Sequence, residues 1–191
     1  MSRGMKVALI LLAIVLFCCC VAGLGVALLG TRLFGRAFIT NPERVHAVGA
    51  QIADFDTPAG YQEMFAMNMM DTKIVIIAPA SYPTNSMMLI LAQFPAGMEL
   101  SQEQKRQLER ALARQTGLGN GDMVHTGQEE TTIKGEPVTL TVREGVTGQG
   151  KQMRQVTASF EGRGGPAILM INGEVDDWDQ AMVDEFIASI R

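Results

Sequence analysis

The chain has 191 residues and a formal net charge of −4, and 47% of its residues are hydrophobic. All 20 acidic residues follow residue 40, whereas four of the 16 basic residues precede it, which leaves 12 basic residues against 20 acidic ones. Such an acidic segment repels phosphate backbones and anionic headgroups, which argues against nucleic acid as a partner and against a domain lying flat on a bilayer.

The first predicted element is a transmembrane helix over residues 7–29, an apolar run without a polar side chain. As a helix it would extend about 34 Å, enough to cross a hydrocarbon core of about 30 Å. We therefore predict a cytoplasmic tail over residues 1–6, the membrane helix, a juxtamembrane linker over 30–40 and one extracytoplasmic domain over 41–191. The predicted location is the cell membrane, with a single pass.

Two properties of this N-terminal segment leave alternatives open. Arg3 and Lys6 before the apolar run and the small residues near Cys20 also fit a cleaved signal peptide, although a signal segment is usually about 7–15 residues long. Basic residues flank both ends, so the charge rule barely decides the orientation, and we place the domain outside because long C-terminal domains translocate largely regardless of charge.

All cysteines lie in this run, so the domain has no disulfide framework and no thiol nucleophile.

The first half of the domain is predicted to contain one helix and three strands. Asn41 and Pro42 are typical of a helix start, because asparagine caps free backbone N–H groups and proline suits the first helical position. After a turn at residues 57–60, apolar and β-branched residues predict the strands, which are 61–69, 73–78 and 87–94. The last two are apolar on both faces, which indicates central strands covered from two sides.

A second helix is predicted over residues 101–116, where it would cover the sheet. Ser101 opens a capping box, and Gly117 occupies the position of a C-cap. The helix carries the only dense basic patch of the domain, a candidate surface for an acidic partner or a lipid headgroup, formed by Lys105, Arg106, Arg110 and Arg114. The glycines of residues 117–121 follow a helix and lack a GK[ST] ending, so they do not predict a phosphate-binding loop.

The second half of the domain repeats the strand pattern and ends in a helix. The predicted strands are 123–133, 138–146, 152–160 and 167–172, with a hairpin turn at residues 134–136. The last helix is predicted over 178–190, with Phe186 among the residues that face inward. Acidic residues gather before it, but they lack the D-x-[DN]-x-[DN]-G spacing of a calcium loop and do not predict a cation site.

The predicted elements follow the order helix, three strands, helix, four strands, helix. This order resembles the fold of the photosystem II extrinsic protein PsbP and its bacterial relatives. Three segments add to the resemblance, namely Thr132–Val138, Gly165–Gly173 and Asp177-Trp178-Asp179. Residues 41–70 are also similar to uncharacterised single-pass bacterial membrane proteins. The resemblance covers most of residues 41–191 and brings no catalytic motif. It implies an α+β fold, an α/β/α sandwich in which helices flank an antiparallel sheet, used chiefly for docking to other proteins.

Catalytic signals are weak. His46 and His125 are the only histidines, and no G-x-S-x-G turn accompanies them. The sequence favours a non-catalytic domain without a cofactor. Two other functions stay open: the handling of Cu(I), described in the next paragraph, is the first alternative, and a membrane-anchored hydrolase is the second. Chemistry by a pair of carboxylates also stays open. The main prediction is a membrane-anchored accessory domain that interacts with a protein partner.

A methionine cluster supports the first alternative, an extracytoplasmic Cu(I)-handling protein. The cluster is Met64, Met67, Met69 and Met70, and soft thioether sulfurs suit Cu(I). Strand alternation, however, sends Met67 and Met69 to one face of the sheet and Met64 and Met70 to the other, which would split the site. Methionine also commonly fills gaps in cores.

Overall fold

The structure is a computed structural model that describes residues 38–81, 87–97, 107, 123–148 and 150–191. Contacts divide the chain into two units, Met1–Phe38 and Ile39–Arg191. In chain order, the described elements are β1 (Phe38–Ile39), α2 (Pro42–Gly49), β2 (Tyr61–Met69), β3 (Thr72–Pro79), β4 (Met88–Gln93), β5 (Val124–Ile133), β6 (Glu136–Val146), β7 (Gln152–Gly162), β8 (Gly165–Glu174), the short 3-10 helix η1 (Val175–Asp177) and α4 (Gln180–Ser189).

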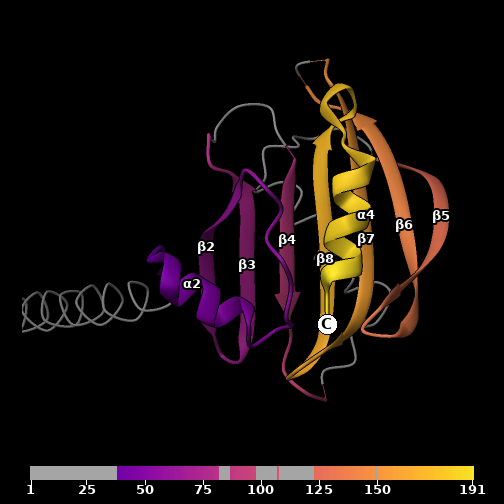
Figure 1. Cartoon of the computed structure of the whole chain (residues 1–191). Coiled ribbons are helices and arrows are strands. Elements are labelled where there is room, and N and C mark those ends of the chain that lie inside the picture. The colour runs from indigo at the N-terminus through magenta and orange to yellow at the C-terminus, as the bar shows by residue number, and fades with distance from the viewer. Residues whose placement is uncertain (1–37, 82–86, 98–106, 108–122, 149) are drawn as a thin grey trace, which may run out of the picture. The chain divides into compact units, whose positions relative to one another are not determined.

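The strands form one eight-stranded sheet in the order β1-β2-β3-β4-β8-β7-β6-β5 (Figure 1). Strands β2 to β4 form one antiparallel meander, and β5 to β8 form a second. The two meanders join where β4 pairs antiparallel with β8, with Ile90 opposite Met170. Strand β5 lies at one edge of the sheet, and no described strand pairs with its outer side.

Local signals act as the sequence predicts. The side chain of Asn41 caps α2 by accepting a hydrogen bond from the backbone N–H of Arg44, and Pro42 occupies the first turn. At the β5–β6 hairpin, Lys134 and Gly135 have φ values of 55° and 79°, the pattern of a type I′ turn. The predicted helix start and this hairpin are confirmed.

Both described helices pack on the same face of the sheet, as Figure 1 shows. Val45 and Val48 of α2, and Val183 and Phe186 of α4, belong to one cluster of buried side chains with the sheet residues beneath them. The ring of Phe55, in the segment after α2, lies 5.9 Å from the ring of Phe186 in an edge-to-face arrangement. We call this side the helix face of the sheet.

The opposite face of the sheet, which we call the far face, carries two smaller buried clusters. One contains Ile90 and Met170, and the other contains Ala92, Phe94 and Ile168. No described helix packs on this face. Apolar residues on both faces of the central strands were therefore correctly expected, but among the described residues the second helical layer is missing.

The predicted fold class is corrected accordingly. The described chain is a mostly antiparallel eight-stranded sheet with two α-helices on one face, and it is not a PsbP-like α/β/α sandwich. The seven strands predicted from periodicity are present with small shifts at their ends, because alternation is a local property of the chain. The number and placement of the helical layers depend on contacts that periodicity does not encode.

Several predictions lie outside the described residues. They are the tail over 1–6, the transmembrane helix over 7–29, most of the linker over 30–40, nearly all of the helix over 101–116, and the glycines of 117–121. In the part of the chain that the structure describes, no helix is long and apolar enough to cross a membrane.

Candidate functional site

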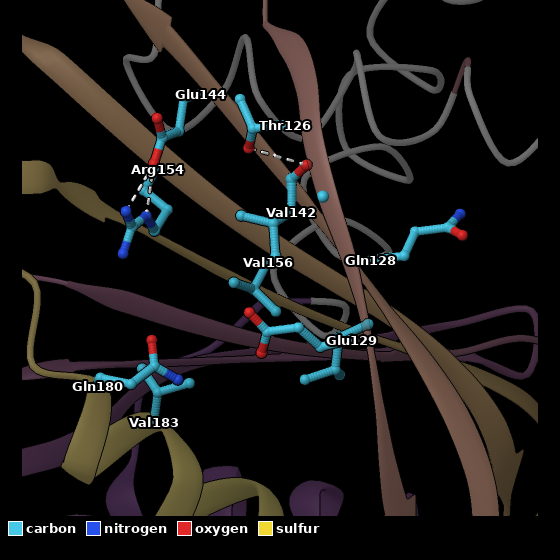
Figure 2. Close-up of a pocket in the computed structure, with 11 residues that line it drawn as sticks. Thr126, Gln128, Glu129, Val142, Glu144, Arg154, Val156, Gln180 and Val183 are labelled. Carbon is cyan, nitrogen blue, oxygen red and sulfur yellow. Dashed lines mark hydrogen bonds and ion pairs between the residues drawn. The ribbon is translucent and has the colours of Figure 1, made fainter.

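A groove between α4 and strands β5–β7 is the candidate site. It contains a pocket of ≈ 290 Å³ on the helix face of the sheet (Figure 2). The floor is apolar and consists of Leu140, Val142 and Val156 from the sheet and Val183 from α4. A concave apolar surface with a few polar groups around it is the usual form of a binding site.

Strand alternation builds this floor. Val138, Leu140 and Val142 lie at every second position of β6 and join the buried cluster on the helix face. Val156 of β7 lies directly opposite Val142 and therefore on the same face. In the view of Figure 1, α4 lies in front of β8 and β7, while β6 and β5 extend beyond it, and the groove forms where the helix stops covering the sheet.

An ion pair between Arg154 and Glu144 lies at one end of the groove. Nε of Arg154 donates to Oε1 of Glu144 at 2.8 Å, and Nη2 approaches the same oxygen at 2.7 Å (Figure 2). The Arg154 guanidinium also lies over the ring of Trp178, 5.4 Å from its centre. Glu144 and Arg154 face each other directly across β6 and β7. The positive charge of Arg154 is therefore compensated within the site.

The N-terminus of α4 forms another wall of the groove, next to Arg154 and Trp178. Asp179 caps the helix by accepting a hydrogen bond from the backbone N–H of Met182 at 3.0 Å. Oε1 of Gln180 accepts from the indole N–H of Trp178 at 2.9 Å, and its Nε2 donates to Asp184 at 2.8 Å. These contacts hold the Gln180 amide at the pocket rim, where it can offer polar contacts to a ligand.

Glu129 of β5 supplies a charge without a partner. It lies opposite Leu140 and therefore on the helix face, and it lines the pocket. No described residue pairs with its exposed carboxylate. The groove thus combines an apolar floor, a compensated ion pair and one carboxylate that no other described residue pairs with.

The structure changes the expected arrangement of the methionine cluster. A β-bulge between Glu63 and Phe65 adds a residue to β2, so simple alternation fails at Met64. Sδ of Met64 accepts a hydrogen bond from Nε2 of Gln62, which lies opposite Ala78 on the far face. Met64 therefore shares the far face with Met67 and Met69. The expectation that Met64 points away from Met67 and Met69 is wrong.

Met70 lies apart from this row of sulfurs. It occupies the β2–β3 turn with φ of 51° and is 87% exposed. The structure therefore aligns three of the four predicted thioethers on one strand face and leaves the fourth at the hairpin tip. The other predicted site, formed by Lys105, Arg106, Arg110 and Arg114, lies outside the described residues.

Neither histidine lies in a catalytic arrangement in the described part of the chain. Nδ1 of His46 lies 2.9 Å from Oε1 of Glu63, and the hydroxyl of Thr57 donates to that same oxygen. A triad would instead need the hydroxyl to donate to the imidazole. His125 is exposed on β5, opposite Arg143.

The acidic residues before α4 serve local structure. Glu174 pairs with Lys151 at 2.5 Å, and Asp179 is the helix cap. Among the described residues, no group of three or more histidine, cysteine, aspartate or glutamate side chains is placed to hold a metal ion.

The sequence reasoning did not single out the groove. The alternation of apolar and polar residues in the sequence predicted the apolar face of β6. The two walls of the groove, α4 and β5, are about 50 residues apart in the sequence, and no motif links them. Glu144, Arg154 and Trp178 come together only through strand pairing and the η1 turn. A cross-strand charge pair is visible in sequence only once the register is known.

Two solved structures are distantly similar to this chain. No family model and no curated protein matches the chain. A Pseudomonas aeruginosa protein of unknown function, PA94, described as a putative regulator, is 10% identical with a TM-score of 0.30, and the match covers 59% of this chain and 83% of that one. LpqN of Mycobacterium tuberculosis, described as involved in cell envelope biogenesis, is 11% identical with a TM-score of 0.36, covering 72% and 80%.

Proposed function

We propose that this protein is a non-catalytic interaction domain that binds a segment of a partner protein in the groove between α4 and strands β5–β7. One observation carries the proposal: an apolar floor and a polar rim meet beside an open edge of the sheet. Such a surface offers apolar contact area and fixed polar groups to one chain segment.

The contacts of the described residues favour binding over catalysis. They contain no hydroxyl that donates to a histidine, and the ion pair in the groove is already satisfied. Arg154 and Trp178 hold each other in place, and Gln180 is held between Trp178 and Asp184. A preorganised rim lowers the entropy cost of binding, because its side chains are ordered before the partner arrives.

Site-specific photo-cross-linking tests the proposal. A benzoylphenylalanine side chain is placed at Gln128, on the pocket rim, in the full-length protein in its native cell. We expect a discrete adduct with one partner. The same photoreactive side chain at Glu43, exposed on α2, is the matched control and should not give that adduct.

A second variant connects the adduct to the pocket. Val142→Phe fills the pocket with a larger ring, and it should abolish the Gln128 adduct. A cooperative unfolding transition of the variant shows that it still folds. An adduct that forms equally well with the filled pocket, or from both positions, would contradict the proposal.

A second candidate function, Cu(I) binding, is favoured by the β-bulge at Met64. The bulge places Met64 on the same strand face as Met67 and Met69, which removes the objection that alternation splits the cluster. Met67 and Met69, two residues apart on this face, are close enough along the strand to share one Cu(I), which accepts low coordination numbers with soft donors.

Competition with a Cu(I) chelator under anaerobic conditions tests this candidate. We expect one equivalent to bind and the affinity to fall at least tenfold in Met67→Leu and in Met69→Leu. Met182→Leu, a half-buried methionine on α4, is the control and should bind as the parent does. Equal affinities in the three variants would exclude this site.

A further inference from the structure

We infer that the segment bound in the groove is an extended strand with two adjacent basic side chains, and that it adds to the open edge of β5. This inference rests on the proposed function and specifies how the groove is used. It joins three observations: an edge strand whose outer side no described strand occupies, a pocket that shares residues with that edge, and negative charge on both sides of the strand that no described residue pairs with.

The edge of β5 is long enough to hold a peptide strand. After a bulge between His125 and Gly127, the pairing with β6 is regular from Gln128 to Ile133. No described strand occupies the outer side of this stretch. Its outward N–H and C=O groups can therefore accept an added strand through backbone hydrogen bonds, a common mode of peptide recognition.

The same edge forms one wall of the pocket. Gly127, Gln128 and Glu129 of β5 line it, and Gln180 and Val183 of α4 line the other side. Further along, the backbone N–H of Lys134 donates to the carbonyl of Ile190, so the end of α4 stays close to the end of β5. Alternate side chains of an added strand would stand on the helix face beside the pocket, while the others would point to the far face.

The negative charges beside the edge of β5 favour a bound strand with basic side chains. Glu129 faces the groove and Glu130, the next residue, faces the other side of the sheet, and both are exposed. On α4, Asp179 and Asp184 add negative charge, whereas Arg154 is already paired. Because consecutive residues of a strand point to opposite faces, two adjacent basic residues would meet Glu129 and Glu130 respectively.

A second copy of this chain fits the edge poorly. If two β5 strands paired antiparallel about their centres, Glu129 and Glu130 of one copy would lie beside those of the other. Like charges directly across a strand pair are destabilising. Charge therefore favours a different partner, one that brings positive side chains to this edge.

Binding of a defined peptide to the full-length protein tests the inference. The probe is a fluorescent peptide, Thr-Val-Thr-Lys-Arg-Thr-Val-Thr, and its control has glutamates in place of the two basic residues. We expect the basic probe to bind more tightly at low salt than at high salt, and the acidic one not to bind. Amide hydrogen exchange in residues 128–133 should slow in the complex, because the outward N–H groups become paired.

Matched variants separate charge from folding. Glu129→Gln and Glu130→Gln should each weaken binding of the probe about two- to fivefold, since exposed ion pairs contribute modestly. Glu43→Gln removes the same charge from α2 and should leave the affinity unchanged. Equal affinities in all three variants, or unchanged exchange in β5, would overturn the inference.

The remaining outcomes distinguish this inference from the proposed function. If the basic probe does not bind while the Gln128 adduct persists and depends on the pocket, the inference fails and the interaction domain stands. If both are negative, both fail, and Glu129 and Glu130 then serve only to keep the edge from pairing nonspecifically. If the protein instead associates with itself and this association slows amide exchange in β5, the partner at this edge is a second copy of the chain, and the inference of a basic partner is overturned.

Discussion

The imidazole Nδ1 of His46 lies 2.9 Å from Oε1 of Glu63 and links helix α2 to strand β2. The two side chains differ greatly in exposure, because that of His46 is 68% exposed and that of Glu63 only 9%. Thr57 donates a second hydrogen bond to the same carboxylate oxygen, at 3.2 Å. The buried carboxylate is therefore the centre of this contact, and the histidine is its exposed partner.

This asymmetry predicts unequal costs of truncation. Glu63→Ala should lower the free energy of unfolding by about 1–3 kcal/mol, because it removes both hydrogen bonds and packing near Phe55. His46→Ala should cost less than about 1 kcal/mol, since an exposed pair is screened by solvent. Urea unfolding of the two variants checks this, and a larger loss for His46→Ala would contradict it.

The β2–β3 turn predicts a stabilising substitution. Met70 and Asp71 both have positive φ, 51° and 62°, which disfavours a side chain such as that of methionine. Met70→Asn should raise the free energy of unfolding by up to about 1 kcal/mol, because asparagine tolerates this conformation. Met69→Asn, one residue earlier in the strand, is the control. A gain of the same size there would show that the turn is not the cause.

Tyr61 predicts a loss of stability at alkaline pH. Burial, and secondarily the negative charge of Asp179, raises the pKa of the Tyr61 hydroxyl above its ordinary value of 10.0. The unfolded chain therefore releases this proton at a lower pH than the folded one, so the stability from this group is complete below pH 10.0 and falls as pH rises through the folded pKa. Tyr61→Phe should flatten the fall in urea midpoint above that pH. An unchanged slope would contradict the assignment.

The aromatic residues near α4 predict different costs of removal. Phe186 is 1% exposed and in the main core cluster, so Phe186→Ala should cost about 3–5 kcal/mol. Trp178 is only partly buried and lies under Arg154, so Trp178→Ala should cost clearly less and should weaken partner binding in the groove. Denaturant unfolding compares the two, and equal costs would show that Trp178 is a core residue.

Local features of this fold could be predicted from the sequence. The strand over residues 61–69, the cap at Asn41 and the Lys134-Gly135 hairpin depend on alternation, side-chain hydrogen bonds and turn conformation within a few residues. Sequence therefore determined where most described strands lie and which face of β6 is apolar.

Only the tertiary structure decided how these elements meet. The pairing of β4 with β8, the open edge of β5 and the position of α4 join segments far apart in the chain, and no local pattern encodes them. The bulge at Met64 likewise arises where β2 adjusts to β3, and it reverses the face that alternation assigns. The groove with Glu129, Arg154 and Trp178 exists for the same reason, because its walls form only when distant segments pack together.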